Sequence, residues 1–270
     1  MILYKYYSPK PYNFCSVCEG KLWFATNKLL NDPYDLYSGM SIVEIPFKRF
    51  NHLSNYITKT ISNTKQSEVF LAVIKSYASC SFSINPIDRL MWAHYADGYK
   101  GFCVGYEVKE QNNFFHKVIY CDQQLPLYQQ KNIRYLPDFN SHIDDIVNNW
   151  RKEFNNINDF DIDIKKGLSM DHIKRYSNEY LTSFLTHLMC IKAQEWCYEQ
   201  EIRLIKQIDY KKVGELISID NFSLIPKEII IGNRFNQENL SIIQKIEKKY
   251  QIESKQLQLD EKRYYALNFK

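Results

Sequence analysis

The sequence predicts an α+β protein built on a mixed, mostly antiparallel sheet, with a helical insertion. About seven segments have strand patterns and about five have helical spacing, and the two kinds do not alternate as they do in α/β proteins. Of the 270 residues, 45% are hydrophobic and 15% aromatic, enough to bury a sizeable core. Between the early and the late strands, residues 122–190 contain segments whose apolar residues recur at the spacing of a helix. We therefore expect a single domain over 1–270 with a helical insertion at 122–190.

The first segments predict two strands around a short helix. Leu3–Tyr7 reads as a strand that ends before prolines, which cannot continue a hydrogen-bonded ladder. Asn13–Glu19 reads as a helix that Gly20 ends in the left-handed conformation. The apolar run Lys21–Thr26 is typical of a strand buried on both faces.

A corner of helix, turn and strand follows the strand Tyr77–Ser83. A short amphipathic helix begins at Leu90 and ends at Gly98. The next strand, Phe102–Val108, begins after Gly101. Side chains of such a turn can converge on a ligand. His94, beside Tyr95, is then a general base or a ligand to a ribose hydroxyl; the alternative is a hydrogen-bonded histidine in an ordinary corner.

The remaining elements complete the expected fold. Asp171–Lys192 has a capping residue and one apolar stripe, which predicts a long helix. The other expected helices lie at 53–61, 68–77, 143–154 and 240–250, and the other expected strands at 115–121, 199–206, 216–219, 228–231 and 266–269.

The composition excludes several classes of protein. The formal charge is +4 without a long basic run, which argues against broad binding to a nucleic-acid backbone. No apolar stretch suits a signal peptide or a membrane span. Seven scattered cysteines indicate free thiols in a reducing cytoplasm. Cys15 and Cys18 have no matching second pair, so we expect no metal site.

The sharpest chemical pattern is an acidic strand late in the chain. On a strand with a period of two, Glu199, Glu201 and Arg203 share one face, while Ile202 and Leu204 share the other. Arg203 then keeps Glu201 ionised, so that the carboxylate stabilises positive charge that develops on a substrate. The alternative is an exposed sheet face with ordinary cross-strand ion pairs.

A second pattern, Asn-Asp-Pro-Tyr-Asp at 31–35, is open to two interpretations. Its side chains suit a tight turn for backbone reasons alone. They also allow a metal-dependent nuclease that uses Asp32, Asp35, His94 and a strand glutamate. A third alternative is a module that binds a nucleotide or partner through the aromatic corner without turnover.

Several blocks together resemble one bacterial family. They are Leu-Tyr-Lys-Tyr at 3–6, Gly-Lys-Leu-Trp-Phe-Ala at 20–25, Asn-Asp-Pro-Tyr-Asp at 31–35, Cys-Ser-Phe-Ser at 80–83, Leu-Met-Trp-Ala-His-Tyr-Ala at 90–96 with Lys-Gly at 100–101, Trp-x-Tyr-Glu-x-Glu-x-Arg-Leu at 196–204 and Ile-Ile-Ile-Gly at 229–232. In order and over nearly the whole chain, this set resembles the bacterial domain of unknown function twenty-nine seventy-one. That resemblance implies no activity.

The order of elements also resembles the ADP-ribosyltransferases, a fold of NAD-cleaving toxins and effectors. This likeness implies NAD as cofactor, a catalytic Glu201 in a Glu-x-Glu pair with Glu199, and an acceptor protein or nucleic acid. His94 takes the part of the His or Arg that the first strand lacks. The implied cofactor-binding residues are Tyr4, Tyr6, Trp23, Thr26, Tyr95 and Arg203. We therefore expect a cytoplasmic NAD-cleaving enzyme of a toxin or phage-defence system.

Overall fold

The computed structural model describes residues 1–32, 35–36, 75–109, 114–121, 186, 189–260 and 267–269. The chain divides into two compact units. The first unit comprises residues 1–33, 75–118 and 195–270, and the second comprises 34–74 and 119–194. The predicted α+β class with a mixed, mostly antiparallel sheet is confirmed. The single domain over 1–270 and the insertion at 122–190 stay predictions.

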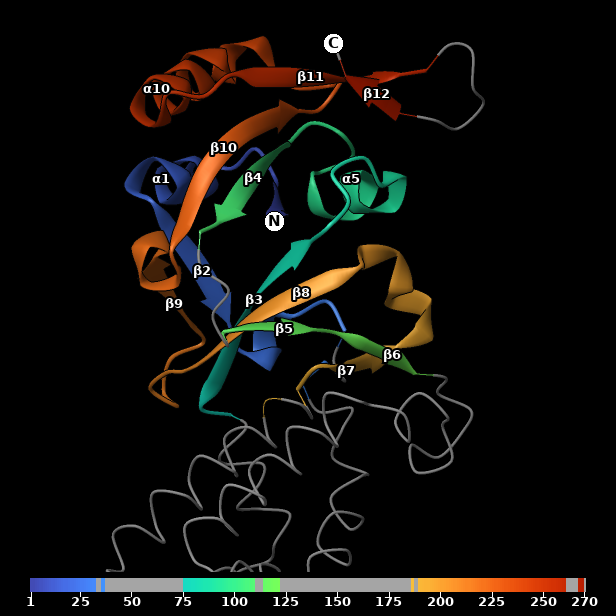
Figure 1. Ribbon diagram of the computed structural model, residues 1–270, viewed down its shortest axis with the longest axis vertical. Helices are drawn as coiled ribbons and strands as arrows, with labels where there is room; N and C mark the ends of the chain where they lie inside the picture. The colour runs from blue at the N-terminus through green and yellow to red at the C-terminus, as the bar shows by residue number, and fades with distance from the viewer. Residues whose placement is uncertain are drawn as a thin grey trace, which may run out of the picture. The chain divides into compact units, whose positions relative to one another are not determined.

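The first unit is built on a ten-stranded sheet in the order β12-β11-β10-β4-β1-β3-β2-β9, with β8 beside β3 and β5 beside β8 (Figure 1). All of its described pairings are antiparallel except that of β10 with β11. The strands are β1 (Ile2–Tyr7), β2 (Lys21–Ala25), β3 (Tyr77–Ser83), β4 (Phe102–Val108), β5 (Phe115–Lys117), β8 (Glu201–Gln207), β9 (Gly214–Ser218), β10 (Leu224–Ile231), β11 (Ser254–Leu259) and β12 (Leu267–Phe269).

The sheet divides where β3 meets its neighbours β1 and β2. The ladder of β1 with β3 consists of the pair Tyr4–Ser83, whereas β3 pairs with β8 along its whole length. Beyond this junction, Lys5 Nζ donates to the Ser81 carbonyl over 3.2 Å. The Lys5 side chain thus supplies a hydrogen bond to the Ser81 carbonyl at a point where β1 and β3 no longer pair, and a carbonyl left unpaired there would be costly to bury.

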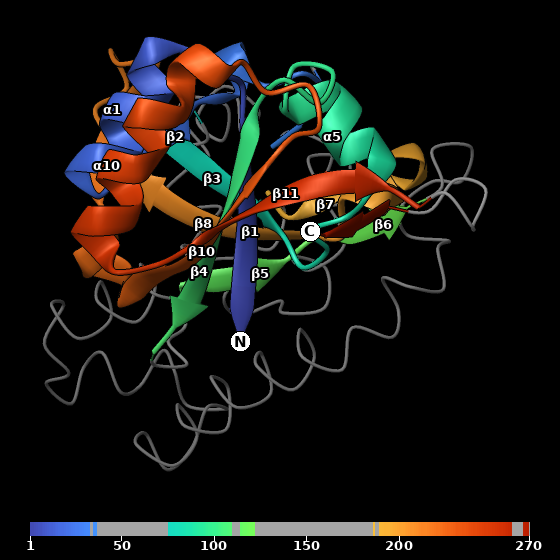
Figure 2. The same cartoon turned by 90° about the horizontal axis from the view of Figure 1, so that it is seen from above.

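Helices lie on the two faces of this sheet (Figure 2), and the side chains that they bury form two cores. The larger core packs α1 (Pro11–Glu19) and α10 (Leu240–Tyr250) against one face, around residues such as Leu3, Phe102 and Leu204. The smaller core packs α5 (Arg89–Tyr95) against the other face. Its centre is Trp92, which is fully buried and meets the Tyr6 ring edge-on at 5.4 Å.

The N-terminal helix ends against the C-terminal one. Gly20 adopts the left-handed conformation at φ 70°, as predicted, and its N–H bonds to carbonyls of the last turn. From α10, the Tyr250 hydroxyl donates to the Val17 carbonyl over 2.8 Å, and Lys249 donates to the Cys18 carbonyl. Tyr250 thus adds a second bond to the Val17 carbonyl, which already accepts from the Gly20 N–H, and Lys249 bonds a further carbonyl at the helix end.

A tight turn joins α5 to β4. The Asp88 side chain caps α5 by accepting from two backbone N–H groups. Asp97 and Tyr99 have positive φ angles of 50° and 71°, a backbone conformation that residues other than glycine rarely adopt. A Cβ at Gly101 would lie 2.0 Å from the Tyr7 carbonyl oxygen. Close backbone contacts at Gly101 and the Tyr99 side chain, which stacks on Trp92 and donates to the Arg89 carbonyl, together fix the turn.

In the second unit, β6 (Ile119–Cys121) pairs in parallel with β7 (Ile191–Ala193). Asp35 and Lys192 form a buried ion pair at 3.4 Å, and Asp35 also accepts from the Leu36 N–H. The carboxylate of the turn residue Asp35 is thus paired with a buried lysine side chain.

Several sequence-based elements need correction. The predicted helix over 171–192 is wrong at its end, because residues 189–190 form a turn and Ile191–Ala193 a strand. The predicted strand over 115–121 is interrupted at Val118. Strand β11 was not predicted. The helices expected at 53–61 and 143–154, and nearly all of those at 68–77 and 171–192, lie outside the described residues.

Candidate active site

One row of directly opposed residues crosses the centre of the sheet. Tyr4 on β1 lies opposite Ser83 on β3, and Ser83 lies opposite Glu201 on β8. Directly opposed residues project from the same face of a sheet. This face, which we call the site face, is the one covered in part by α5; Leu204 and Ile202 project to the larger core, as predicted.

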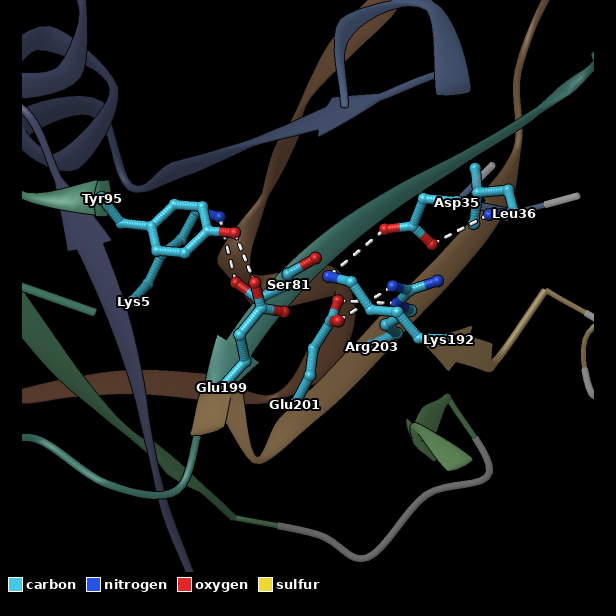
Figure 3. A network of polar contacts seen from close by, with 9 residues as sticks. All are labelled: Lys5, Asp35, Leu36, Ser81, Tyr95, Lys192, Glu199, Glu201 and Arg203. Carbon is cyan, nitrogen blue, oxygen red and sulfur yellow. Dashed lines mark hydrogen bonds and ion pairs between the residues drawn. The ribbon is translucent and has the colours of Figure 1, made fainter. Parts of the chain in front are cut away.

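Glu201 and Arg203 form a buried ion pair on the site face (Figure 3). Arg203 Nε and Nη2 donate to the two carboxylate oxygens of Glu201 over 2.6 and 2.8 Å. The exposed fractions are 2% for Glu201 and 0% for Arg203. A guanidinium bound through two bonds holds the carboxylate ionised and fixes its plane.

Glu199 does not lie on the strand, which corrects the prediction that it shares a strand face with Glu201. It is the last residue of η6 (Gln194–Glu199), a 3₁₀ helix, and Gln200 follows with a φ of 45°. This left-handed residue turns the chain before β8 begins. Glu199 is 3% exposed and accepts from the Tyr95 hydroxyl of α5 (Figure 3).

Burial and Glu199 together set the state of the Tyr95 hydroxyl. Burial, followed by the neighbouring Glu199 carboxylate, raises the pKa of Tyr95 well above its usual range. Tyr95 is therefore a protonated donor at all ordinary pH values. Tyr6 is likewise protonated, since burial raises its pKa, and its hydroxyl donates to the Asn85 carbonyl over 2.6 Å.

Three of the predicted site residues lie apart from this row. His94 is exposed, and its ring centre lies 6.2 Å from that of Tyr198. Trp23 is 41% exposed on β2, opposite Leu216 of β9. Thr26 is buried, and its hydroxyl donates to the Val213 carbonyl over 3.0 Å. Moreover, the strand between β1 and β8 is β3, and not β2, the strand that contains Trp23.

The metal alternative finds no support in the described part of the chain. Within it, no group of three or more His, Cys, Asp or Glu side chains is placed to hold a metal ion. Asp35 is paired with Lys192, and His94 is exposed.

Sequence reasoning missed Ser83 and Glu228. Glu228 on β10 accepts from the Tyr4 hydroxyl over 2.8 Å. For Ser83 a signal existed, because serines alternate with bulky residues along Tyr77–Ser83 and therefore occupy one face. No local signal marks Glu228, since its partner lies 224 residues away in the sequence.

The fold and site define an α+β protein with a split, mostly antiparallel sheet and a buried carboxylate–guanidinium pair on one face. A family described as a protein of unknown function (DUF2971) matches residues 91–204, from within α5 to within β8. The predicted family resemblance is thus confirmed over these residues, which include Glu199, Glu201 and Arg203. No curated protein and no solved structure matches the chain. Among the described helices, none has the length and apolar character that crossing a bilayer requires.

Proposed function

We propose that the protein is an ADP-ribosyltransferase-like enzyme that cleaves NAD, with Glu201 as its catalytic carboxylate. The observation that carries the proposal is the row Tyr4–Ser83–Glu201, which joins the first strand, a serine-bearing strand and the late acidic strand on one face. The ADP-ribosyltransferase likeness calls for a first strand with a His or Arg, a second strand with aromatic or hydroxyl side chains, and a late glutamate. In this proposal Ser83 and Glu201 take the last two parts, and Tyr4 stands on the first strand in place of the His or Arg.

In the proposed reaction, Glu201 and Arg203 have different tasks. The bond between the nicotinamide nitrogen and the ribose breaks, and its electron pair leaves with nicotinamide. The ribose is left with oxocarbenium character, which an ionised carboxylate stabilises electrostatically. Arg203 keeps Glu201 ionised and oriented through its two bonds. An acceptor nucleophile or water then bonds to the ribose carbon and loses its proton.

Burial of the carboxylate sets a condition on this function. At 2% exposure, Glu201 contacts a dinucleotide only after side chains around it move. Glu199 and Tyr95, held to each other by a hydrogen bond, come from η6 and α5 (Figure 3). We propose that parting of this pair opens the way to Glu201.

The test is release of free nicotinamide from NAD by the purified protein, with and without EDTA. Glu201→Gln keeps the side-chain volume and loses the charge, so we expect a loss of about 10²–10³-fold in turnover. Glu215→Gln, in an exposed pair with Lys212, is the matched control and should turn over like the wild type. EDTA should change nothing, because this cleavage needs no metal.

Two results would contradict the assignment. Nicotinamide release by a folded Glu201→Gln variant at the wild-type rate would remove Glu201 from the mechanism. Release abolished by EDTA would favour the metal-dependent alternative. A toxin or phage-defence role gives a cellular readout as well: expression of the wild type should arrest growth, and expression of Glu201→Gln should not.

A further inference from the structure

The row that contains Glu201 continues across two more strands. Tyr4 lies opposite Gly105 on β4, and Gly105 lies opposite Glu228 on β10. The Tyr4 side chain reaches over β4, and its hydroxyl donates to Glu228 Oε1 over 2.8 Å. The other oxygen, Oε2, accepts from Lys255 Nζ on β11 over 2.9 Å. We call Tyr4, Glu228 and Lys255 the far cluster.

The far cluster depends on the glycine beneath it. A Cβ at Gly105 would lie 2.9 Å from Glu228 Cγ and 3.0 Å from Tyr4 Cε1. The tyrosine ring and the glutamate chain therefore lie directly over the backbone of β4. The cluster is also more accessible than the Glu201–Arg203 ion pair, because the Glu228 side chain is 16% exposed.

The hydrogen bonds of the far cluster determine what it can bind. The Tyr4 hydroxyl gives its proton to Glu228, so toward a ligand its oxygen can only accept. Burial, and after it Glu228, raises the pKa of Tyr4, so the phenol keeps this arrangement at ordinary pH. The carboxylate is likewise an acceptor. Hydroxyl groups of a ribose meet this requirement, whereas a phosphate brings negative charge against Glu228.

Position decides which part of a ligand arrives there. Gly105, at the centre of the far cluster, is separated from Glu201 by three strand spacings, about 14 Å at ~4.8 Å each. A mononucleoside held at Glu201 does not reach that far. An extended dinucleotide whose nicotinamide ribose lies at Glu201 places its second nucleoside in this region.

We propose that the far cluster is the subsite for the adenosine ribose of NAD, and that Glu228 excludes the 2′-phosphate of NADP. The inference rests on the proposed function. A carboxylate that accepts from a ribose 2′-hydroxyl is a general means of selecting NAD over NADP. Lys255 donates to Glu228 over 2.9 Å, and replacement of Glu228 by a neutral residue removes the charge that repels a 2′-phosphate.

The experiment compares NAD with NADP for the wild type, Glu228→Gln and Glu107→Gln. The readouts are kcat/KM for nicotinamide release and Kd by titration calorimetry. We expect the wild type to prefer NAD by about 10²-fold or more. Glu228→Gln should reduce this preference at least ten-fold, chiefly by improved use of NADP. Glu107, in an exposed ion pair with Lys227 on the neighbouring strand, is the matched control and should keep the wild-type preference.

The possible outcomes separate the two proposals. NAD turnover with an unchanged NAD-to-NADP ratio in folded Glu228→Gln overturns the subsite and leaves the proposed function standing. Equal use of both dinucleotides by the wild type does the same. Absence of both binding and turnover overturns both proposals. Tyr4→Phe, which keeps the ring over Gly105, provides a second variant: weaker NAD binding supports the subsite, and unchanged NAD binding contradicts it.

Discussion

Replacement of Arg203 by methionine tests the electrostatics of the candidate site through stability alone. The variant removes both bonds to Glu201, of 2.6 and 2.8 Å, and leaves a carboxylate that is 2% exposed without its guanidinium. Loss of one partner of a buried ion pair costs about 3–5 kcal/mol. For a chain of this size that corresponds to a fall in melting temperature on the order of 10 °C.

The assay is unfolding in urea and on heating, followed by circular dichroism, for the wild type and two variants. Lys227→Met removes an exposed ion pair with Glu107 and should change the free energy of unfolding by less than about 0.5 kcal/mol. If Arg203→Met also stays within 1 kcal/mol of the wild type, the carboxylate is well solvated and the reasoning about its charge is wrong.

Three further outcomes are expected. The pKa of Tyr95 is higher in the folded than in the unfolded protein, so its contribution to stability is complete below about pH 10 and is lost as the pH rises further. Tyr95→Phe should therefore lose less stability above about pH 10 than the wild type does. Urea titrations that give the same dependence of unfolding free energy on pH for both proteins would contradict this. Gly105→Ala should destabilise by about 1–3 kcal/mol, since its Cβ overlaps Glu228; calorimetry that shows wild-type stability would refute the close packing. In native protein a thiol reagent should label the exposed cysteines, Cys15 and Cys197, well before the buried ones, as peptide mapping would show.

Local patterns predicted the elements whose determinants are local. The strand Phe102–Val108 and the helix at 240–250 were placed at their observed bounds, because a glycine break and an amphipathic stripe define them within a few residues. The helix expected over 171–192 failed at its end. Its apolar stripe runs on through Ile191, but Ile191 pairs with Ile119 in a parallel ladder that no local pattern encodes.

The candidate site was predictable in its residues and less so in its geometry. The period of two correctly placed Glu201 and Arg203 on one face, because both lie within a regular strand. Glu199 was misplaced, since the left-handed backbone of Gln200 interrupts the alternation and no glycine marks that turn. The far cluster lay beyond sequence reasoning, because it joins residues from opposite ends of the chain.

The contact between α1 and α10 bears on when this protein folds during synthesis. Carbonyls at the end of the N-terminal helix accept from Lys249 and Tyr250, and β1 lies between strands that emerge from the ribosome much later. The apolar side chains of α1 therefore stay uncovered by α10 until residues 240–250 have been synthesised. Chains whose native contacts join residues far apart in the sequence fold slowly and expose apolar surface in the meantime. We therefore expect this surface to be prone to aggregation while the chain is being synthesised.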